Sequence, residues 1–421
     1  MTKRLSEFCD PARSICYGIV QPGNQVDNGL PVIRVKDLSG DRINVKDVMR
    51  VAPEIEARYR RSRIRSGDVL ISLVGSMGQV AIAGPEVDGW NIARAVGLIP
   101  AIDRHHAEWL RFSLQSQEAQ DFINNHANTT VQATFNLKDL ARIPIPYPSK
   151  PVRDAVLQIL GALDDKIEVN RKASATMEEM ARALYRSWFV DFEPVWAKLE
   201  GRKPAHMDAI TAALFPDNFD DDGLPTGWRK RSIYDLSLVK YGAPFASSKF
   251  NSIGEGRPLA RIRDLKSGTA GVSTTEVHRG EYLIQPGDTV VGMDGDFTAY
   301  TWANSEALMN QRVCCFLPIA ERDKGFVRFA LPALLKAEED AAVATTVIHL
   351  GKKDIDKFEV AIATPEVMSA FGGVVNNWLS RLVSLGLENR TLTTLRDTLL
   401  PRLMSGELRV GEARELVEEV A

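Results

Sequence analysis

The stretch Gly29-Leu-Pro-Val-Ile-Arg-Val-Lys-Asp-Leu38 occurs again, 227 residues later, as Gly256-Arg-Pro-Leu-Ala-Arg-Ile-Arg-Asp-Leu265, with Gly, Pro, Arg, Asp and Leu at the same places. A second stretch, Ser66-Gly-Asp-Val-Leu-Ile-Ser-Leu-Val-Gly75, aligns with Pro286-Gly-Asp-Thr-Val-Val-Gly-Met-Asp-Gly295 at an offset of 220. Ordered matches with slowly changing offsets are typical of a duplicated unit whose copies differ by short loop insertions. We therefore predict two copies of one domain, residues 1–150 and residues 225–364.

Further matches follow in the same order along both copies. They are Arg94 with Arg312, Pro100 with Pro318, Thr129-Thr-Val131 with Thr345-Thr-Val347, Lys138-Asp139 with Lys353-Asp354, and Asn170-Arg171 with Asn389-Arg390. Within each copy, short β-branched and apolar runs bounded by Gly, Pro and Asp predict strands. Residues 107–125 and 324–341 are predicted helices, so each copy is expected to be a mixed α/β domain.

After each copy the apolar residues take up a heptad spacing, which indicates a long helix. The first seam contains Val156, Leu160, Leu163, Ile167, Asn170, Ser174, Met177, Ala181, Leu184 and Trp188. The second contains Phe371, Val375, Trp378, Leu382, Leu385, Asn389, Leu392, Leu399 and Leu403. About forty residues of helix extend roughly 60 Å. An asparagine within such a seam lowers stability and fixes register and orientation.

These patterns predict an α+β fold: two mixed α/β domains separated by a long antiparallel helical coiled coil, with a pseudo-twofold internal repeat. The first spacer helix is placed at 151–192 and the second at 365–408, with a connector at 193–224 and a C-terminal tail at 409–421. The alternative is that each long helix packs only on its own domain.

Composition limits the classes of function. The net charge is −3, and no apolar run is long enough to span a membrane. The first residues do not resemble an export signal, so we expect a cytoplasmic protein. Residues 1–150 carry 19 Lys and Arg against 16 Asp and Glu, whereas residues 151–224 carry 9 against 14. The acidity therefore belongs to the connecting segments, and the densest basic cluster, Arg58 to Arg65, lies in the first copy.

The residues of common catalytic and metal sites are not found together in the sequence. The four cysteines are not spaced as metal ligands and are interpreted as reduced structural thiols, and the six histidines are scattered. We find no phosphate loop, no methyltransferase motif and no dinucleotide fingerprint. The pairs Asp164/Asp165 and Asp294/Asp296 are interpreted as structural rather than catalytic. We therefore predict no metal site and no catalytic residues.

The whole chain resembles the specificity subunits of type I restriction-modification systems. Besides the repeated stretches, the resemblance depends on Leu224-Pro-Thr-Gly-Trp228, Trp188-Phe-Val-Asp-Phe-Glu-Pro194 and Leu399-Leu-Pro-Arg-Leu-Met-Ser-Gly-Glu-Leu408. It implies a non-catalytic host-defence protein in which two target-recognition domains each read one half of a split, asymmetric DNA sequence. One departure is the abrupt start at Leu5-Ser-Glu-Phe8, which leaves the opening strand of the first domain uncertain.

The resemblance also implies partners: double-stranded DNA, two methyltransferase subunits and restriction/translocase subunits. S-adenosylmethionine, ATP and magnesium are expected on those partner subunits and none in this chain. Two other classes of function stay open, a stand-alone DNA-modifying enzyme and a coiled-coil protein adaptor.

Candidate site residues follow from the chemistry of DNA contacts and of exposed apolar surface. For DNA binding they are Arg58, Arg60, Arg61, Arg63, Arg65, Gln132, Asn136, Lys249, Arg261, Arg263, Lys352 and Lys353. For partner binding they are Leu184, Trp188, Phe189, Leu399, Leu400 and Leu403, because these exceed what one two-helix seam can bury. The repeated residues Arg34, Arg261, Arg94 and Arg312 have an alternative role in bracing the fold.

Overall fold

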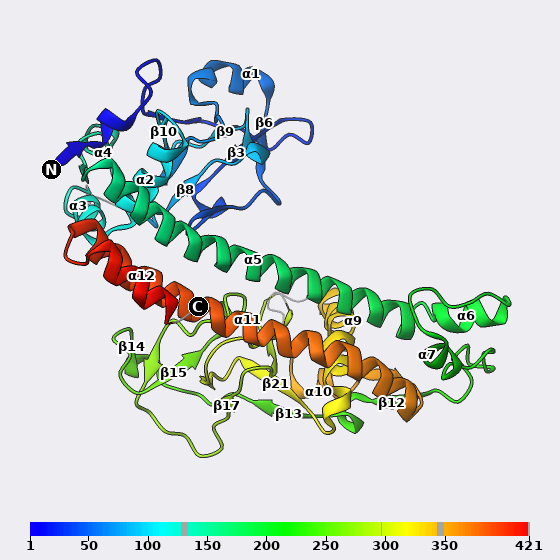
Figure 1. Cartoon of the computed structure of the whole chain (residues 1–421). Helices are drawn as coiled ribbons and strands as arrows, with labels where there is room; N and C mark the ends of the chain where they lie inside the picture. Colours follow the sequence, from blue (N-terminus) through cyan, green and yellow to red (C-terminus); the bar gives the residue numbers. More distant parts are fainter. Residues whose placement is uncertain (128–133, 296, 343–348, 420–421) are drawn as a thin grey trace. The chain divides into compact units, whose positions relative to one another are not determined.

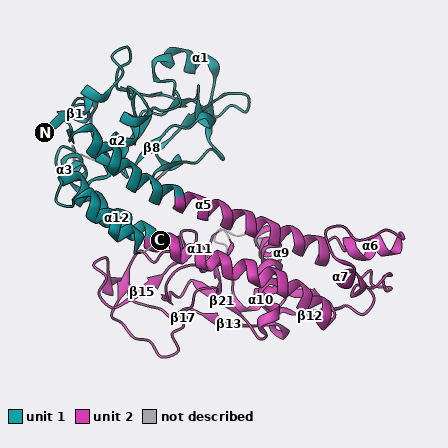
Figure 2. Ribbon diagram, viewed as in Figure 1, with its two compact units in different colours: residues 1–165, 392–421 teal, residues 166–391 magenta. Residues whose placement is uncertain are grey.

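The protein was analysed as a computed structural model, which describes residues 1–127, 134–295, 297–342 and 349–419 (Figure 1). The chain divides into two compact units (Figure 2). Unit 1 holds residues 1–165 and 392–421, and unit 2 holds residues 166–391. Each division point falls inside one of the long helices, so each unit contains one sheet-bearing domain and parts of both helices.

The domain in unit 1 is built on a four-stranded sheet in the order β2-β10-β7-β8 and a three-stranded sheet in the order β6-β3-β9. Its strands are β1 (Thr2–Arg4), β2 (Cys16–Tyr17), β3 (Leu30–Ile33), β4 (Leu38–Ser39), β5 (Arg42–Ile43), β6 (Met49–Val51), β7 (Val69–Ser72), β8 (Val80–Ile82), β9 (Asn91–Ile92), β10 (Val96–Ile99) and β11 (Pro144–Pro146). Its helices are α1 (Pro53–Glu56), α2 (Arg104–Gln115), α3 (Gln117–Asn125) and α4 (Leu137–Leu140), with 3-10 turns η1 (Leu5–Phe8), η2 (Val35–Asp37), η3 (Ala57–Ser62) and η4 (Pro85–Val87).

The domain in unit 2 repeats this plan with a four-stranded sheet in the order β13-β21-β18-β19 and a five-stranded sheet in the order β14-β16-β15-β20-β17. Its strands are β12 (Arg229–Ser232), β13 (Ser237–Tyr241), β14 (Phe250–Asn251), β15 (Arg257–Ala260), β16 (Ser273–Thr274), β17 (Leu283–Ile284), β18 (Thr289–Gly292), β19 (Ala299–Thr301), β20 (Ala307–Met309), β21 (Val313–Pro318) and β22 (Glu359–Ile362). Its helices are α8 (Ile262–Leu265), α9 (Lys324–Ala342) and α10 (Lys352–Ile355), with 3-10 turns η5 (Ile233–Asp235), η6 (Ser247–Lys249) and η7 (Glu321–Asp323).

Strand pairing confirms the duplication. The β3 strand pairs in parallel with β9, and β15 pairs in parallel with β20. The register also agrees, since β7 and β8 align Val69 with Ile82 while β18 and β19 align Thr289 with Thr301. A parallel pair inside an otherwise antiparallel domain is a specific feature, and its recurrence shows that the two halves share one fold.

The sequence comparison was wrong by one residue at Arg94. The amide of Leu73 donates to the carbonyl of Ala95, and the amide of the equivalent Met293 donates to the carbonyl of Arg312. The counterpart of Arg312 is therefore Ala95. The match of Pro100 with Pro318 is wrong by one residue in the same way. A shift of one residue in a strand moves a side chain to the opposite face, so Arg94 and Arg312 are not equivalent. The repeated Thr-Thr-Val segments lie outside the described residues.

Two expectations about local structure are corrected. The first domain does have an opening strand, because β1 pairs with β11 as β12 pairs with β22. The predicted single helix over 107–125 is two helices, α2 and α3. Ser116 separates them because its backbone is extended and its hydroxyl accepts a hydrogen bond from the amide of Ala119 in the next helix.

The long helices are α5 (Lys150–Phe189) and α11 (Pro365–Ser405), and they pair antiparallel within each unit. In unit 2, Asn170 Nδ2 donates to Asn389 Oδ1 at 3.1 Å, and the ammonium of Lys166 lies 3.0 Å from Glu388. In unit 1, Arg396 bonds Asp164 at 2.8 Å. In unit 2, Phe189 of α5 lies 4.9 Å from Phe371 of α11 between ring centroids, whereas Asn170 bonds Asn389; rising numbers on one helix thus face falling numbers on the other, which confirms the antiparallel coiled coil.

Each long helix also packs on a domain. Packing on a domain, which was the alternative to helix pairing, therefore occurs together with it. In unit 2, Trp188 and Phe189 of α5 and Phe371 of α11 belong to one core with the strands of the second domain. The connector contains α6 (Glu193–Leu199) and α7 (Ala209–Ala213), and the tail contains α12 (Val410–Glu418). Within the described part of the chain, no helix combines the length and apolar character needed to cross a membrane.

Candidate nucleic-acid interface

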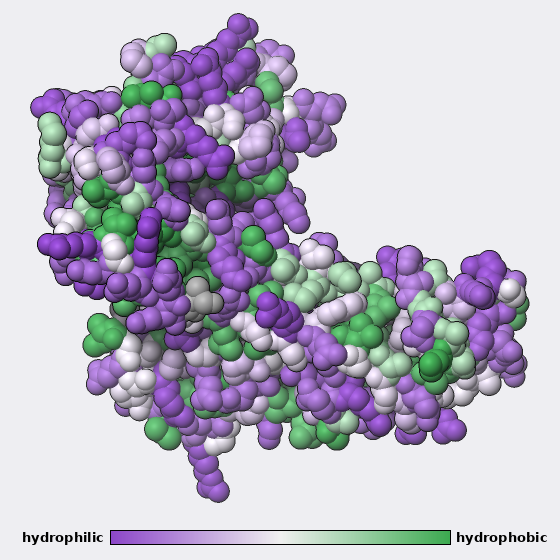
Figure 3. Space-filling view, in the orientation of Figure 1, coloured by the Kyte–Doolittle hydropathy of each residue, from purple (hydrophilic) through white to green (hydrophobic). Residues whose placement is uncertain are grey.

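The exposed basic residues of the first domain gather where the chain leaves α1. Arg58, Arg60 and Arg61 lie on η3, are exposed, and form no ion pair with any residue that the structure describes. Figure 3 shows mostly hydrophilic side chains over the part of the first domain that holds α1. Guanidinium groups of this kind suit contacts to the phosphate oxygens of DNA.

Arg63 differs from its neighbours because it is tied to a buried acid. Its Nε lies 2.6 Å from one oxygen of Glu56 and its Nη2 lies 2.5 Å from the other. This bidentate contact is the main cause that lowers the pKa of Glu56, whose side chain is 1% exposed. Arg63 therefore braces the segment, and its assignment to DNA binding stays a prediction. Arg65 is exposed, and its backbone amide donates a hydrogen bond to the carboxylate of Asp68.

The other predicted readers of the first domain are Gln132 and Asn136. Gln132 lies outside the described residues. Asn136 caps α4, where its Oδ1 accepts from the amide of Asp139 and its Nδ2 donates to the carboxylate of the same residue. Its polar atoms are thus used by the fold, because an Asn at a helix N-terminus satisfies an otherwise unpaired amide.

In the second domain the predicted contacts are spread over separate elements. Lys249 lies on η6, Arg263 on α8 and Lys353 on α10; all three are exposed and have no ion pair among the residues described. Lys352 bonds Asp356 at 2.7 Å and lies over the ring of Tyr234. Their assignment to DNA binding stays a prediction.

The arginine of the repeated motif braces the fold in both copies. Arg34 contacts Asp37 at 3.2 Å, and Arg261 contacts Asp264 at 2.9 Å. In each case the buried carboxylate also accepts the backbone amide of the arginine. The alternative role of Arg261 in bracing the fold is thus present, and its assignment to DNA binding stays a prediction.

Several ionisable groups that sequence reasoning set aside are brought together. In the second domain Asp294 lies 2.7 Å from His349 and 3.3 Å from Arg312. In the first, Asp103, His105 and His106 offer ligand atoms within 4.8 Å of one another. Those atoms already have partners, because Asp103 caps α2 and bonds His106 while His105 bonds Asp154. The sequence signal for this cluster was the close spacing of Asp103, His105 and His106 at the start of a helix.

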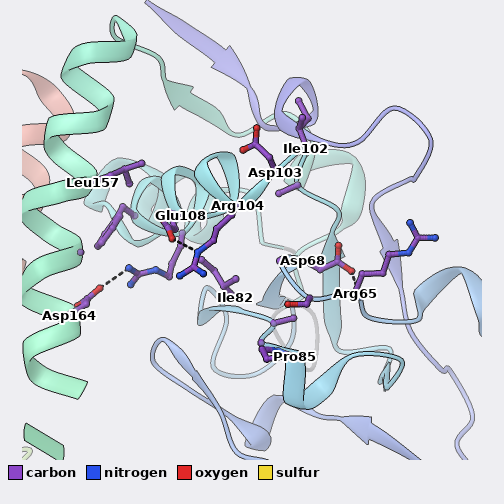
Figure 4. A pocket seen from close by; sticks show the side chains of 18 of the residues that line it. Arg65, Asp68, Ile82, Pro85, Ile102, Asp103, Arg104, Glu108, Leu157 and Asp164 are labelled. Carbon is purple, nitrogen blue, oxygen red and sulfur yellow. Dashed lines mark hydrogen bonds and ion pairs between the residues drawn. The ribbon is translucent and has the colours of Figure 1, made fainter. Parts of the chain in front are cut away.

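A cavity of about 920 Å³ lies in unit 1 between the first domain and the N-terminal part of α5. Figure 4 shows Arg104 directed at Glu108 and Asp164 within an ion pair on α5. The partner of Asp164 is Arg111 on α2, at 2.7 Å, and Arg396 is the second. Of the pair Asp164/Asp165, Asp164 therefore has a structural role, because it joins α2 to both long helices.

The thiols carry no reactive site. Burial raises the pKa of the Cys9 thiol to about 12 and that of the Cys314 thiol to about 12. Burial also raises the pKa of the Cys315 and Cys16 thiols. Since the thiolate is the reactive form, these cysteines are structural near neutral pH.

Comparison with known proteins shows what the chain resembles. A family model described as the type I restriction modification DNA specificity domain matches residues 3–179. The type I restriction enzyme HindI specificity subunit of Haemophilus influenzae is 25% identical over 434 residues, covering 90% of this chain and 92% of that protein. By these comparisons the chain is similar to the type I specificity subunits.

Two further comparisons agree with this resemblance. The type I restriction enzyme EcoBI specificity subunit of Escherichia coli is 32% identical over 146 residues, which cover 34% of this chain and 31% of that protein. A solved structure of the S subunit of a type I restriction-modification system from M. genitalium superposes with a TM-score of 0.52 at 15% identity, covering 96% of this chain and 95% of that one. The latter likeness concerns the fold.

The residues expected to face partner subunits are buried, except Leu184, which is partly buried. Trp188 and Phe189 are each 4% exposed within the aromatic core of unit 2, where Leu184 is partly buried. Leu399, Leu400 and Leu403 are buried as well. The expectation that these apolar side chains stay exposed because the helix seam cannot bury them is therefore wrong. Each long helix buries a second face against a domain.

Some of the exposed apolar side chains lie in the connector. Trp196 and Leu199 lie on α6 and are 47% and 51% exposed, while Ile210 on α7 is 81% exposed. The sequence did not distinguish these residues from their buried neighbours, because the short helices of the connector show little periodicity.

Proposed function

We propose that this chain is the non-catalytic reader of a type I restriction-modification complex, in which each of its two domains recognises one half of a split, asymmetric DNA target. The observation that supports this proposal is the duplication itself. Two domains of one fold differ in the cations that they expose, so two different half-sites are the natural ligands. The 40 residues of α5 correspond to roughly 60 Å of helix, longer than one turn of B-DNA.

In this proposal the first domain contacts DNA through Arg58, Arg60, Arg61 and Arg65. The second uses Lys249, Arg263 and Lys353, which the structure leaves without ion pairs among the described residues. Phosphate contacts fix position on the duplex, whereas base edges in the major groove supply sequence information. Lys352 stays a weaker candidate because Asp356 already neutralises it.

The chain is further proposed to recruit two methyltransferase subunits and the restriction/translocase subunits. S-adenosylmethionine, ATP and magnesium belong to those subunits in this proposal, and this chain supplies no catalytic group. A cytoplasmic location is consistent with that role. The exposed apolar residues of α6 and α7 are better candidates for a subunit contact than the buried leucines.

The test is methylation mapping in cells that carry this chain together with its partner subunits. A split motif is expected, and replacing residues 1–150 by the corresponding domain of another specificity subunit should change one half of the motif only. A change in both halves, or a continuous palindromic motif, contradicts the assignment of one half-site to each domain. Methyl transfer or cleavage by the purified chain alone would identify an enzyme instead.

A further inference from the structure

The first domain contains a segment, residues 53–63, that we call the arginine segment. It comprises α1, η3 and Arg63. Its inward side chains, Ile55 and Tyr59, pack on the small core of Ile19, Val32 and Val51. Its outward side chains include Arg58, Arg60 and Arg61, all exposed. The segment therefore presents three cations on a surface that is anchored from below.

A network of fully buried polar side chains lies beneath the arginine segment. Glu56, Ser62 and Asn91 are 1%, 0% and 0% exposed. Asn91 Nδ2 donates to Glu56 at 3.1 Å and to the carbonyl of Tyr59 at 3.1 Å, and Asn91 Oδ1 accepts from the hydroxyl of Ser62 at 2.8 Å. Together with Arg63, this network fixes the segment at its helix end, its middle and its last residue.

The second domain has no such network at the equivalent place. Strand register makes Leu308 the counterpart of Asn91, since Val32 pairs with Asn91 where Leu259 pairs with Leu308. Leu308 is fully buried in an apolar cluster. The corresponding connection, residues 275–282, contains a single arginine, Arg279, and two glutamates.

The difference between the copies shows that the fold does not require the buried network. A leucine fills the same core position in the second domain, and burying an acid and an amide is costly unless every group is paired. When such a network is fully satisfied it holds one conformation firmly. What it holds here is the backbone of η3, including the kink at Tyr59, whose φ of −120° and ψ of 30° leave the helical region.

Holding several arginines close together also has an electrostatic cost. The outward guanidinium groups repel one another, and among the described residues only Arg63 has an acid within ion-pair distance. An unanchored segment would relax by moving the cations apart. A preformed array loses less conformational entropy when an anion binds, which favours a ligand with regularly spaced negative charges.

We propose that the arginine segment is a preformed binding element for the sugar-phosphate backbone of double-stranded DNA in the first recognition domain. Arg58, Arg60 and Arg61 contact phosphates, and Glu56, Asn91 and Arg63 are positioning residues. The inference rests on the proposed function, and it makes the two domains unequal, because the first holds the duplex through a built element that the second lacks.

The first experiment measures the affinity of the full chain for a double-stranded DNA fragment of arbitrary sequence by fluorescence anisotropy over a series of KCl concentrations. Each phosphate contact adds about 0.9 to the slope of log affinity against log salt, so the variant R58A/R60A/R61A should lower the slope by about two to three. The matched control R182A/R186A/R202A removes three exposed arginines of unit 2 and should leave the slope unchanged.

The second experiment tests positioning with the substitution Asn91→Leu, which installs the residue of the second copy and keeps all arginines. Its slope should fall by about one or more, because fewer guanidinium groups reach phosphates together. Circular dichroism melting monitors folding, and Glu56→Gln, which keeps the shape of the side chain, serves as the second variant. A purely structural role would change the melting temperature without changing the slope of correctly folded protein.

The outcomes separate this inference from the proposed function. If the unaltered chain shows no salt-dependent affinity for DNA, the proposed function itself fails. If it binds DNA but the R58A/R60A/R61A variant keeps its slope, the arginine segment is not the binding element. If that variant loses slope while folded Asn91→Leu and Glu56→Gln proteins do not, the positioning role is wrong.

Discussion

The two recognition domains share their strand order and register, yet they differ in how buried charge is used. The first places an acid and an amide in its core beneath exposed arginines, whereas the second places Leu308 there. Both carry an arginine at the same place on the helix that follows the sheet, Arg111 on α2 and Arg328 on α9. Duplication therefore preserved the backbone framework and let the polar interior diverge.

The two helix arginines show the same divergence in detail. Arg328 bonds Glu178 of α5 at 2.7 Å and Thr301 at 3.1 Å. At the position of Thr301 the first domain has Ile82, which offers no acceptor, and Arg111 has its ion pair with Asp164. A domain can thus be joined to a long helix through different acids, provided that each buried guanidinium forms an ion pair with an acid.

The largest expected effect is on the aromatic core of unit 2. Phe189 lies 4.9 Å, between ring centroids, from both Phe326 and Phe371, so Phe189→Ala should lower the free energy of unfolding by about 3–5 kcal/mol. Urea denaturation followed by tryptophan fluorescence measures it. The control Trp196→Ala alters a side chain that is 47% exposed and should cost less than about 1 kcal/mol. Equal effects would contradict the assignment of Phe189 to the core.

Removing the acid of a buried ion pair should destabilise both units. Glu178→Ala leaves Arg328, 4% exposed, without its acid and should cost about 3 kcal/mol. Asp164→Ala leaves Arg111, 10% exposed, without its acid and should cost a similar amount, while Arg396 keeps its contact with Asp397.

The control for the buried charge is the double variant E178A/R328M, measured by the same urea denaturation. Replacing the guanidinium by an apolar side chain removes the unpaired charge, so stability should recover in part. If the double variant is no more stable than Glu178→Ala, the buried charge is not the cause of the loss.

The buried acid Glu56 of the first domain predicts a pH dependence of stability. The contact with Arg63 holds the pKa of Glu56 below its ordinary value of 4.5 in the folded state. Its contribution to stability is therefore present above that value and is lost as pH falls through the lowered folded pKa. Glu56→Gln should cost about 1.5 kcal/mol at pH 7 and progressively less toward pH 3. Urea denaturation at several pH values checks this, and a cost that is constant with pH would contradict it.

The smallest expected effect tests the feature that the copies share. Arg34→Ala and Arg261→Ala each remove a partly exposed arginine from a buried aspartate and should each cost about 0.5–1 kcal/mol. Thermal melting of both variants should give similar shifts. A large difference between them would show that the repeated motif has diverged in role.

Sequence by itself determined the duplication, the heptad seams and the family resemblance, because each depends on residue patterns that extend over many positions. It also indicated the antiparallel pairing, since Asn170 and Asn389 interrupt their seams at corresponding places and bond each other. The basic cluster was visible as a run of arginines, although their partners were not.

Only the tertiary structure decided which of these residues are free. Arg63 and Arg261 are engaged because acids a few residues away in sequence are buried beside them. Trp188 and Leu399 are covered because each long helix buries more than one face, which a single heptad seam does not indicate. Charge and apolarity are properties of a residue, whereas availability to a partner depends on what the fold packs against it.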